Sequence, residues 1–187
     1  MVRLGKAFAV NAKSLTHGTD YAGQRLNGWL VQEKFDGLRC LWDGRALWSR
    51  EGNQFNAPAW FVKQLPAGLV LDGELYAGPG GLTAISNTLA RHKRGDDEAW
   101  TGVEFVAFDA PLSSGNYLAR HAVIPDSSGV FLKATVDAFK SMSRLRAVLR
   151  EVHDRGGEGL MLRHPTAHYE RGRTSKLLKF KCPTLAA

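Results

Sequence analysis

Short runs of alternating apolar and polar residues make up much of the chain. Residues 29–50 contain two such runs on either side of Asp43-Gly44, and an Asp-Gly pair in that position is typical of a β-hairpin. Glycines also bound the apolar run at residues 68–78. The pattern therefore predicts strands within residues 29–50, 68–78, 103–110, 131–136, 159–164 and 176–181.

Three segments between these runs have the features of helices. Residues 57–65 carry Pro58 in the first turn, where a helix tolerates proline, and residues 82–94 form a second candidate. The strongest signal lies in residues 141–157, where a glycine pair follows apolar positions with helical spacing. These positions are Leu145, Val148, Leu149 and Val152. Strands joined by hairpins and interrupted by helices predict a mixed α+β fold with mainly antiparallel sheets.

The composition is that of a folded domain with a basic surface. Of the 187 residues, 44% are hydrophobic and 23% are charged, which predicts one domain with a packed core. The net charge of +7 favours a polyanionic partner, although solubility alone also explains a basic surface. The basic runs at residues 91–94 and 171–173 favour the phosphate-rich partner.

The two cysteines, Cys40 and Cys182, form neither a CxxC pair nor part of a cluster with zinc-ligand spacing. Two free thiols in a reducing compartment are the default interpretation, and one disulfide is the alternative. The N-terminal apolar patch is interrupted by polar residues, and no apolar run is long enough for a membrane helix. We therefore expect a cytoplasmic protein that does not enter a membrane.

Charged residues lie on five of the predicted strands. Each one alone has an ordinary explanation, such as a solvated strand residue or an Asp-Gly turn. Residues two apart on a strand point the same way, which pairs Lys34 with Asp36, Asp72 with Glu74, and Lys179 with Lys181. Cations and carboxylates around one cleft suit a nucleoside triphosphate with a divalent metal ion.

Lys34 is the candidate for covalent chemistry. The chain has no GxxxxGK[ST] phosphate-binding loop, and Lys34 lies in an apolar run, where a lysine is rare unless it is paired or used. A lysine attacks only as the neutral amine, which apolar surroundings and neighbouring cations favour. We predict that the neighbouring cations are Arg39, Lys179 and Lys181.

Six short segments occur in an order that resembles the covalent nucleotidyltransferases, the superfamily of DNA ligases, RNA ligases and mRNA-capping enzymes. Residues 34–39, KFDGLR, match the KxDGxR signature of that superfamily. The others follow in the family's order: SREG (49–52), LDGEL (71–75), FVAFD (105–109), EGLMLR (158–163) and LKFK (178–181). The longer segments WDGRALWSREGN, APAWF and LDGELYAG are most similar to small ATP-dependent DNA ligases of bacteria and their viruses.

The resemblance implies one nucleotidyltransferase domain over residues 1–187. Its fold would be an ATP-grasp-like adenylation fold, with helices flanking the sheets and a nucleotide cleft between them. Lys34 would attack the α-phosphorus of ATP and become lysyl-AMP. The AMP would pass to the 5′-phosphate of nicked double-stranded DNA, and the 3′-hydroxyl would then displace it.

The resemblance also implies a role for each site residue. Catalysis falls on Lys34, Lys179 and Lys181, the last two holding the α-phosphate. Nucleotide binding falls on Gln32 (the adenine amino group), Phe108 (stacking on adenine), Arg39 and Glu74 (the ribose or adjacent phosphate), Arg50 (nucleotide or nick phosphate), and on Lys34, Glu158, Lys179 and Lys181. Binding of Mg²⁺ or its waters falls on Asp72, Glu74 and Glu158.

Two departures from the family pattern shape the expectations. Such ligases continue into an OB-fold that orients the pyrophosphate, and none follows Lys181 here. We expect a monomer whose OB-fold comes, if used, from a separate domain or chain, and which seals pre-adenylated nicks faster than it charges Lys34. Only 33 residues precede Lys34, fewer than the module that binds nicotinamide mononucleotide in NAD⁺-dependent ligases, which predicts ATP. The alternatives are an RNA ligase, a capping-type enzyme, or a nick-binding module with little turnover.

Overall fold

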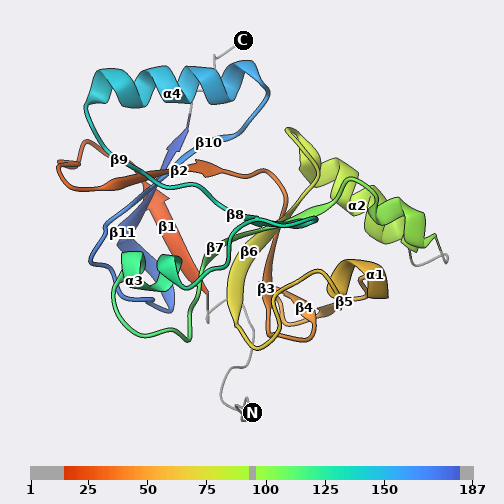
Figure 1. Ribbon diagram of the computed structural model, residues 1–187. Helices are drawn as coiled ribbons and strands as arrows, with labels where there is room; N and C mark the ends of the chain where they lie inside the picture. Colours follow the sequence, from red (N-terminus) through yellow and green to blue (C-terminus); the bar gives the residue numbers. More distant parts are fainter. Residues whose placement is uncertain (1–14, 93–95, 182–187) are drawn as a thin grey trace.

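The computed structural model describes residues 15–92 and 96–181 (Figure 1). Within these ranges the strands form two sheets. The five-stranded sheet has the order β1-β11-β10-β2-β9. Its strands are β1 (Thr16–Asp20), β2 (Leu30–Lys34), β9 (Asp137–Ala138), β10 (Gly159–Arg163) and β11 (Gly172–Lys181).

The six-stranded sheet has the order β5-β4-β3-β6-β7-β8. Its strands are β3 (Leu38–Trp42), β4 (Leu47–Ser49), β5 (Gln54–Phe55), β6 (Leu71–Tyr76), β7 (Glu104–Asp109) and β8 (Phe131–Lys133). Strands β3 and β4 form the hairpin predicted at Asp43-Gly44. Apart from the parallel pairs β1–β11 and β7–β8, the pairings given for the described strands are antiparallel, which confirms the predicted α+β class.

Helix α4 (Met142–Asp154) covers one face of the five-stranded sheet (Figure 1). Ser141 caps its first turn by accepting a hydrogen bond from the Arg144 amide, and Gly156, with a φ of 83°, follows its end. The predicted apolar stripe packs against β10 and β11. The cluster contains Leu145, Leu149, Val152, Leu160, Leu162 and Leu178, all buried.

The larger core lies on the six-stranded sheet, beneath α1 (Ala59–Val62), α2 (Gly81–His92) and the 3₁₀ helix η1 (Asp97–Trp100). Aromatic side chains from strands and helices fill it, among them Trp42, Phe61, Trp100, Phe105 and Phe131. A further helix, α3 (Tyr117–Ala122), is capped by Asn116, whose side chain accepts a hydrogen bond from the Ala119 amide. Strands β1, β5 and β9, helix α3 and η1 lie in segments for which the hydrophobic pattern made no prediction.

The chain crosses from one sheet to the other immediately after Lys34. Residues 29–42 look like one strand region in sequence, but β2 belongs to the five-stranded sheet and β3 to the six-stranded sheet. Gly37 allows the crossing because a Cβ there would lie 2.0 Å from the carbonyl oxygen of Leu75. The crossing places Lys34 at the junction of the two sheets.

A buried ion cluster also joins the two sheets. Asp109 of β7 accepts hydrogen bonds from Arg120 of α3, at 2.8 and 3.1 Å, and from Arg163 of β10, at 3.2 Å. The three side chains are at most 7% exposed. Because a buried carboxylate is tolerated only when it is paired and hydrogen-bonded, the cluster favours one relative placement of these three elements.

The remaining predictions concern the thiols, the basic runs and membranes. Cys40 is a fully buried free thiol, and burial raises its pKa well above the usual value. Cys182, and Lys93 and Arg94 of the first basic run, lie outside the described residues. Among the helices that are described, none combines the length and hydropathy that crossing a bilayer requires.

Candidate active site

A cavity of about 850 Å³ lies between the two sheets, within the size range of small-molecule sites. Alternate residues of β2, β10 and β11 line one wall. These residues are Gln32, Lys34, Met161, Arg163, Leu177, Lys179 and Lys181. The opposite wall comes from the six-stranded sheet and the β4–β5 region, with Arg39, Ser49, Arg50, Glu74 and Phe108.

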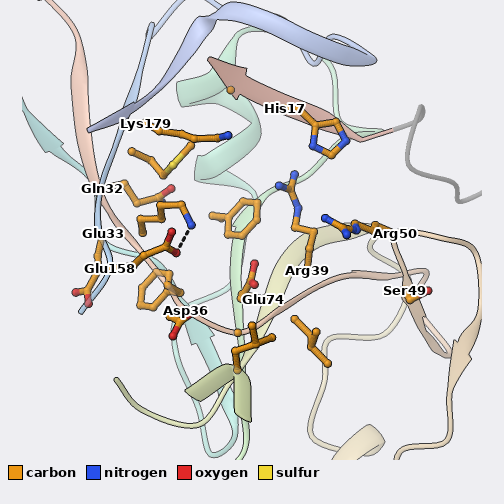
Figure 2. Close-up of a pocket in the computed structure, with 18 of the residues that line it drawn as sticks. His17, Gln32, Glu33, Asp36, Arg39, Ser49, Arg50, Glu74, Glu158 and Lys179 are labelled. Carbon is orange, nitrogen blue, oxygen red and sulfur yellow. Dashed lines mark hydrogen bonds and ion pairs between the residues drawn. The ribbon is translucent and has the colours of Figure 1, made fainter. Parts of the chain in front are cut away.

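Lys34 points into this cavity and has a carboxylate as its direct partner. Its ammonium donates a hydrogen bond to Glu158 Oε2, while Lys181 Nζ lies 2.6 Å from Glu158 Oε1 (Figure 2 shows Glu158). Burial disfavours the Glu158 carboxylate, but the hydrogen bonds from Lys181 and Lys34 outweigh it and lower the pKa of Glu158. The predicted cationic surroundings of Lys34 are thus corrected: Lys181 is close, but a carboxylate lies between the two amines.

Arg39 lines the cavity but binds a buried carboxylate behind it. Its Nε and Nη2 each lie 2.6 Å from Asp72, whose side chain is 1% exposed. The Tyr169 hydroxyl donates a third hydrogen bond to Asp72, also at 2.6 Å. Asp72 does not line the cavity, so the prediction that it binds the metal ion is corrected. Its carboxylate holds Arg39 in place instead.

Glu74 faces the cavity from β6, opposite Arg39 in the β3–β6 pairing. Burial raises the pKa of Glu74 to about 7, against the opposing effect of Arg39 and Lys34. Glu74 therefore gains or loses its proton near neutral pH. A cation or phosphate that enters the cavity would change the protonation state of this carboxyl group.

Phe108 and Gln32 line the cavity from different sheets. Phe108 is 9% exposed, and the Arg39 guanidinium carbon lies 4.7 Å from the centre of its ring. Gln32 is 4% exposed, and its Nε2 donates a hydrogen bond to the Tyr117 hydroxyl at 3.4 Å.

His17, Arg39 and Arg50 lie on one side of the cavity, across from Lys179 and Glu158 (Figure 2). The Arg50 side chain is 61% exposed, and its Nε lies 2.6 Å from the neighbouring Glu51. An ion pair this exposed is weak, so a phosphate that enters the cavity can compete for Arg50.

The structure brings nine of the ten predicted site residues to one cavity, all except Asp72. The sequence interpretation did not assign His17, Met161, Arg163 or Tyr117. The period of two that places Lys34 and Gln32 on one face also places Met161 and Arg163 there, because β10 pairs with β2. Asn116 is a residue type that favours the N-cap of a helix, but this signal locates α3 and not the contact between Tyr117 and Gln32.

The residues fit Mg²⁺ only in company with phosphates. The described residues contain no group of three or more His, Cys, Asp or Glu side chains that could hold a metal ion. Glu74 and Glu158 nevertheless face the same cavity from different sheets. Mg²⁺ is commonly held by one or two carboxylates together with substrate phosphates and water, which this arrangement could supply.

This chain is similar to DNA ligases in both sequence and structure. A family model described as "ATP dependent DNA ligase domain" matches residues 11–181. A DNA ligase of Haemophilus influenzae is 33% identical over 181 residues, which are 94% of this chain and 65% of that protein. The chain thus spans a little under two thirds of that relative.

Solved structures of DNA ligases share the fold of this chain. A structure titled "DNA binding with a minimal scaffold: Structure-function analysis of Lig E DNA ligases" is 31% identical, with a TM-score of 0.80 over 90% of this chain and 68% of that one. The Chlorella virus DNA ligase-adenylate shares the fold at 19% identity, with a TM-score of 0.65 and the same coverage of both chains. With a family model matched over most of its length and a cavity assembled from that family's segments, the chain belongs to the ATP-dependent DNA ligase domain family.

Proposed function

We propose that this chain is the adenylation domain of a DNA ligase that uses ATP to seal nicks between a 5′-phosphate and a 3′-hydroxyl. The observation that carries the proposal is the arrangement Lys34–Glu158–Lys181 inside a nucleotide-sized cavity. The family model and the similarity to DNA ligases support the substrate and the donor.

The first step is attack by the Lys34 amine on the α-phosphorus of ATP. A bond forms between Nζ and phosphorus, the bond from phosphorus to the bridging oxygen breaks, and pyrophosphate leaves with those electrons. The ammonium must first lose a proton, and Glu158 is the hydrogen-bonded acceptor placed to take it. Phosphates that attract Lys181 away from Glu158 remove one interaction that keeps this carboxylate ionised, and so favour the transfer.

The charges on the cavity walls match the charge that develops in this step. Lys179 lies on the Lys34 wall and Arg50 on the opposite one, so the phosphates lie between cations. Mg²⁺ held by Glu74 and the phosphates, and by Glu158 while that carboxylate is still ionised, would neutralise further charge on the leaving group. Phosphoryl transfer depends mainly on such positioning and charge neutralisation.

The later steps need nicked duplex DNA as partner. The net charge of +7 suits a polyanion, and binding through phosphate contacts would weaken steeply with salt. We further propose that the domain acts as a monomer in the cytoplasm, and that an OB-fold on a separate domain or chain assists ATP charging.

The direct test is covalent labelling. The protein is mixed with Mg²⁺ and ATP labelled at the α-phosphate, and denaturing electrophoresis detects lysyl-AMP. We expect label on the wild type and none on Lys34→Ala, while Lys63→Ala, an exposed lysine outside the cavity, stays labelled. Label that persists in Lys34→Ala would refute the nucleophile, and labelled protein that fails to seal nicked DNA would refute the ligase assignment.

A further inference from the structure

Tyr117 is a buried polar residue that neither the predicted site nor the mechanism above uses. It is the first residue of α3 and is fully buried, and its hydroxyl lies 3.4 Å from Gln32 Nε2. Burial raises the pKa of Tyr117 to about 12, so the phenol stays neutral in the physiological range. The phenol oxygen can therefore accept from Gln32 Nε2 throughout this range, as it does in the structure.

The Tyr117 ring is held from its faces by the buried ion cluster. The Arg163 guanidinium carbon lies 4.3 Å from the ring centre, and that of Arg120 lies 6.0 Å from it. Both guanidinium groups bind Asp109. Cation–π contacts with two fixed arginines leave the ring little freedom to rotate or withdraw, so its hydroxyl has a defined position relative to β2.

In the geometry of this contact, one end of the Gln32 amide binds Tyr117 and the other faces the cavity. Because Nε2 donates to Tyr117, the amide oxygen is the end left for a ligand, and the labelled Gln32 side chain directs its oxygen into the cavity (Figure 2). The cavity wall at Gln32 therefore presents an acceptor. Adenine carries an amino donor at C6, whereas guanine carries a carbonyl acceptor there.

We propose that Tyr117 is a positioning residue that makes the cavity select adenine over guanine by fixing the amide of Gln32. The inference rests on the proposed function, because it assumes that the cavity holds a purine nucleoside triphosphate. Guanine would bring two acceptors together and leave a buried group unpaired, a mismatch that commonly changes affinity about ten- to a hundredfold.

The test compares ATP and GTP in wild type and Tyr117→Phe. Rates of lysyl-nucleotide formation are measured over a range of nucleotide concentrations, and the ratio of kcat/KM for ATP to that for GTP is the readout. We expect a wild-type preference for ATP that falls at least about fivefold in Tyr117→Phe, because the released amide can turn its NH₂ toward the guanine carbonyl. The change should lie mainly in KM.

Two further variants separate positioning from general damage. Tyr169→Phe removes a hydroxyl behind the opposite wall, so it should lower both rates while leaving the ratio unchanged. Gln32→Glu presents a carboxylate oxygen in either rotamer when ionised. In that background, adding Tyr117→Phe should no longer change the ratio. A ratio that does not respond to Tyr117→Phe, or a wild type that prefers GTP, would overturn the inference.

Equilibrium binding distinguishes this inference from the proposed function. The α,β-methylene analogues of ATP and GTP are titrated into the same variants by calorimetry. No label on the wild type, combined with adenine preference in binding that depends on Tyr117, would refute the covalent chemistry and support the base selection. If the wild type is labelled but Tyr117→Phe leaves the ratio of kcat/KM for ATP to that for GTP unchanged, the covalent chemistry is supported and the base selection is refuted.

Discussion

Replacing Glu74 by glutamine should stabilise the fold, and the gain should grow with pH. The pKa of Glu74 is raised from 4.5 to about 7, so the folded state holds this proton more tightly than the unfolded chain does. Below pH 4.5 both states are protonated and the carboxyl costs nothing. Between pH 4.5 and 7 the unfolded state ionises first, so folding stability falls, and above pH 7 the loss is complete.

The size of this effect follows from the same values. At about 1.4 kcal/mol per pKa unit, a rise from 4.5 to about 7 sets a ceiling of about 3–4 kcal/mol. Glu74 lines an open cavity and is only partly buried, so solvent screening reduces the expected effect to about 1–2 kcal/mol. The amide of the Glu74→Gln variant would be neutral at every pH and would not carry this loss.

The measurement is urea unfolding of wild type and Glu74→Gln at pH 5 and pH 8.5, with nucleotide and Mg²⁺ omitted. The difference between the two proteins should increase by about 1–2 kcal/mol from the lower to the higher pH. Glu98→Gln, an exposed carboxylate of η1, is the control and should give a constant difference. A Glu74→Gln difference that is also constant, or that shrinks at high pH, would refute the argument from burial.

Asp109→Asn should lower the free energy of unfolding by about 3–5 kcal/mol, because it leaves two buried guanidinium groups without their carboxylate; Glu51→Gln, which breaks an exposed pair, should cost less than about 1 kcal/mol in the same urea titration. Gly37→Ala should abolish lysyl-AMP formation, since the added methyl overlaps the Leu75 carbonyl, and a labelled, stable variant would contradict this. Cys40 should react with a thiol reagent only on unfolding, and fast reaction in native buffer would show that it is accessible. The isolated domain should seal a pre-adenylated nick faster than it charges Lys34, and rates in the opposite order would reject that expectation.

Much of the cavity could be predicted from the sequence, because charged residues that face the cavity alternate with buried apolar residues along its strands. Lys179 and Lys181 share a face through the two-residue period, and β10–β11 pairing places that face beside Glu158. The family's order of segments added Arg50 and Phe108, which no periodicity would have linked to Lys34. Hairpin chemistry gave the β3–β4 turn directly.

Other features could not be predicted, because alternation reports the face of a strand and not the sheet it joins. The run from Trp29 to Trp42 reads as one region, yet Gly37 marks a crossing between sheets that depends on contact with distant β6. Asp72 has the spacing of a cavity carboxylate but is satisfied by Arg39 and Tyr169, a partner 97 positions away in the chain. Tyr117 matters through contacts with β2 and β10 that are equally remote in sequence.

The bridge between the sheets through Asp109, Arg120 and Arg163 has a consequence for inhibitors. Any compound that sought extra room behind Gln32 would have to displace Tyr117, whose ring rests against those two arginines. Displacement would expose a desolvated charge network, so that end of the pocket should behave as a rigid wall. An inhibitor would then gain selectivity by hydrogen bonding to the Gln32 amide. Flexible substituents should be added at its other end, toward the exposed side chain of Arg50.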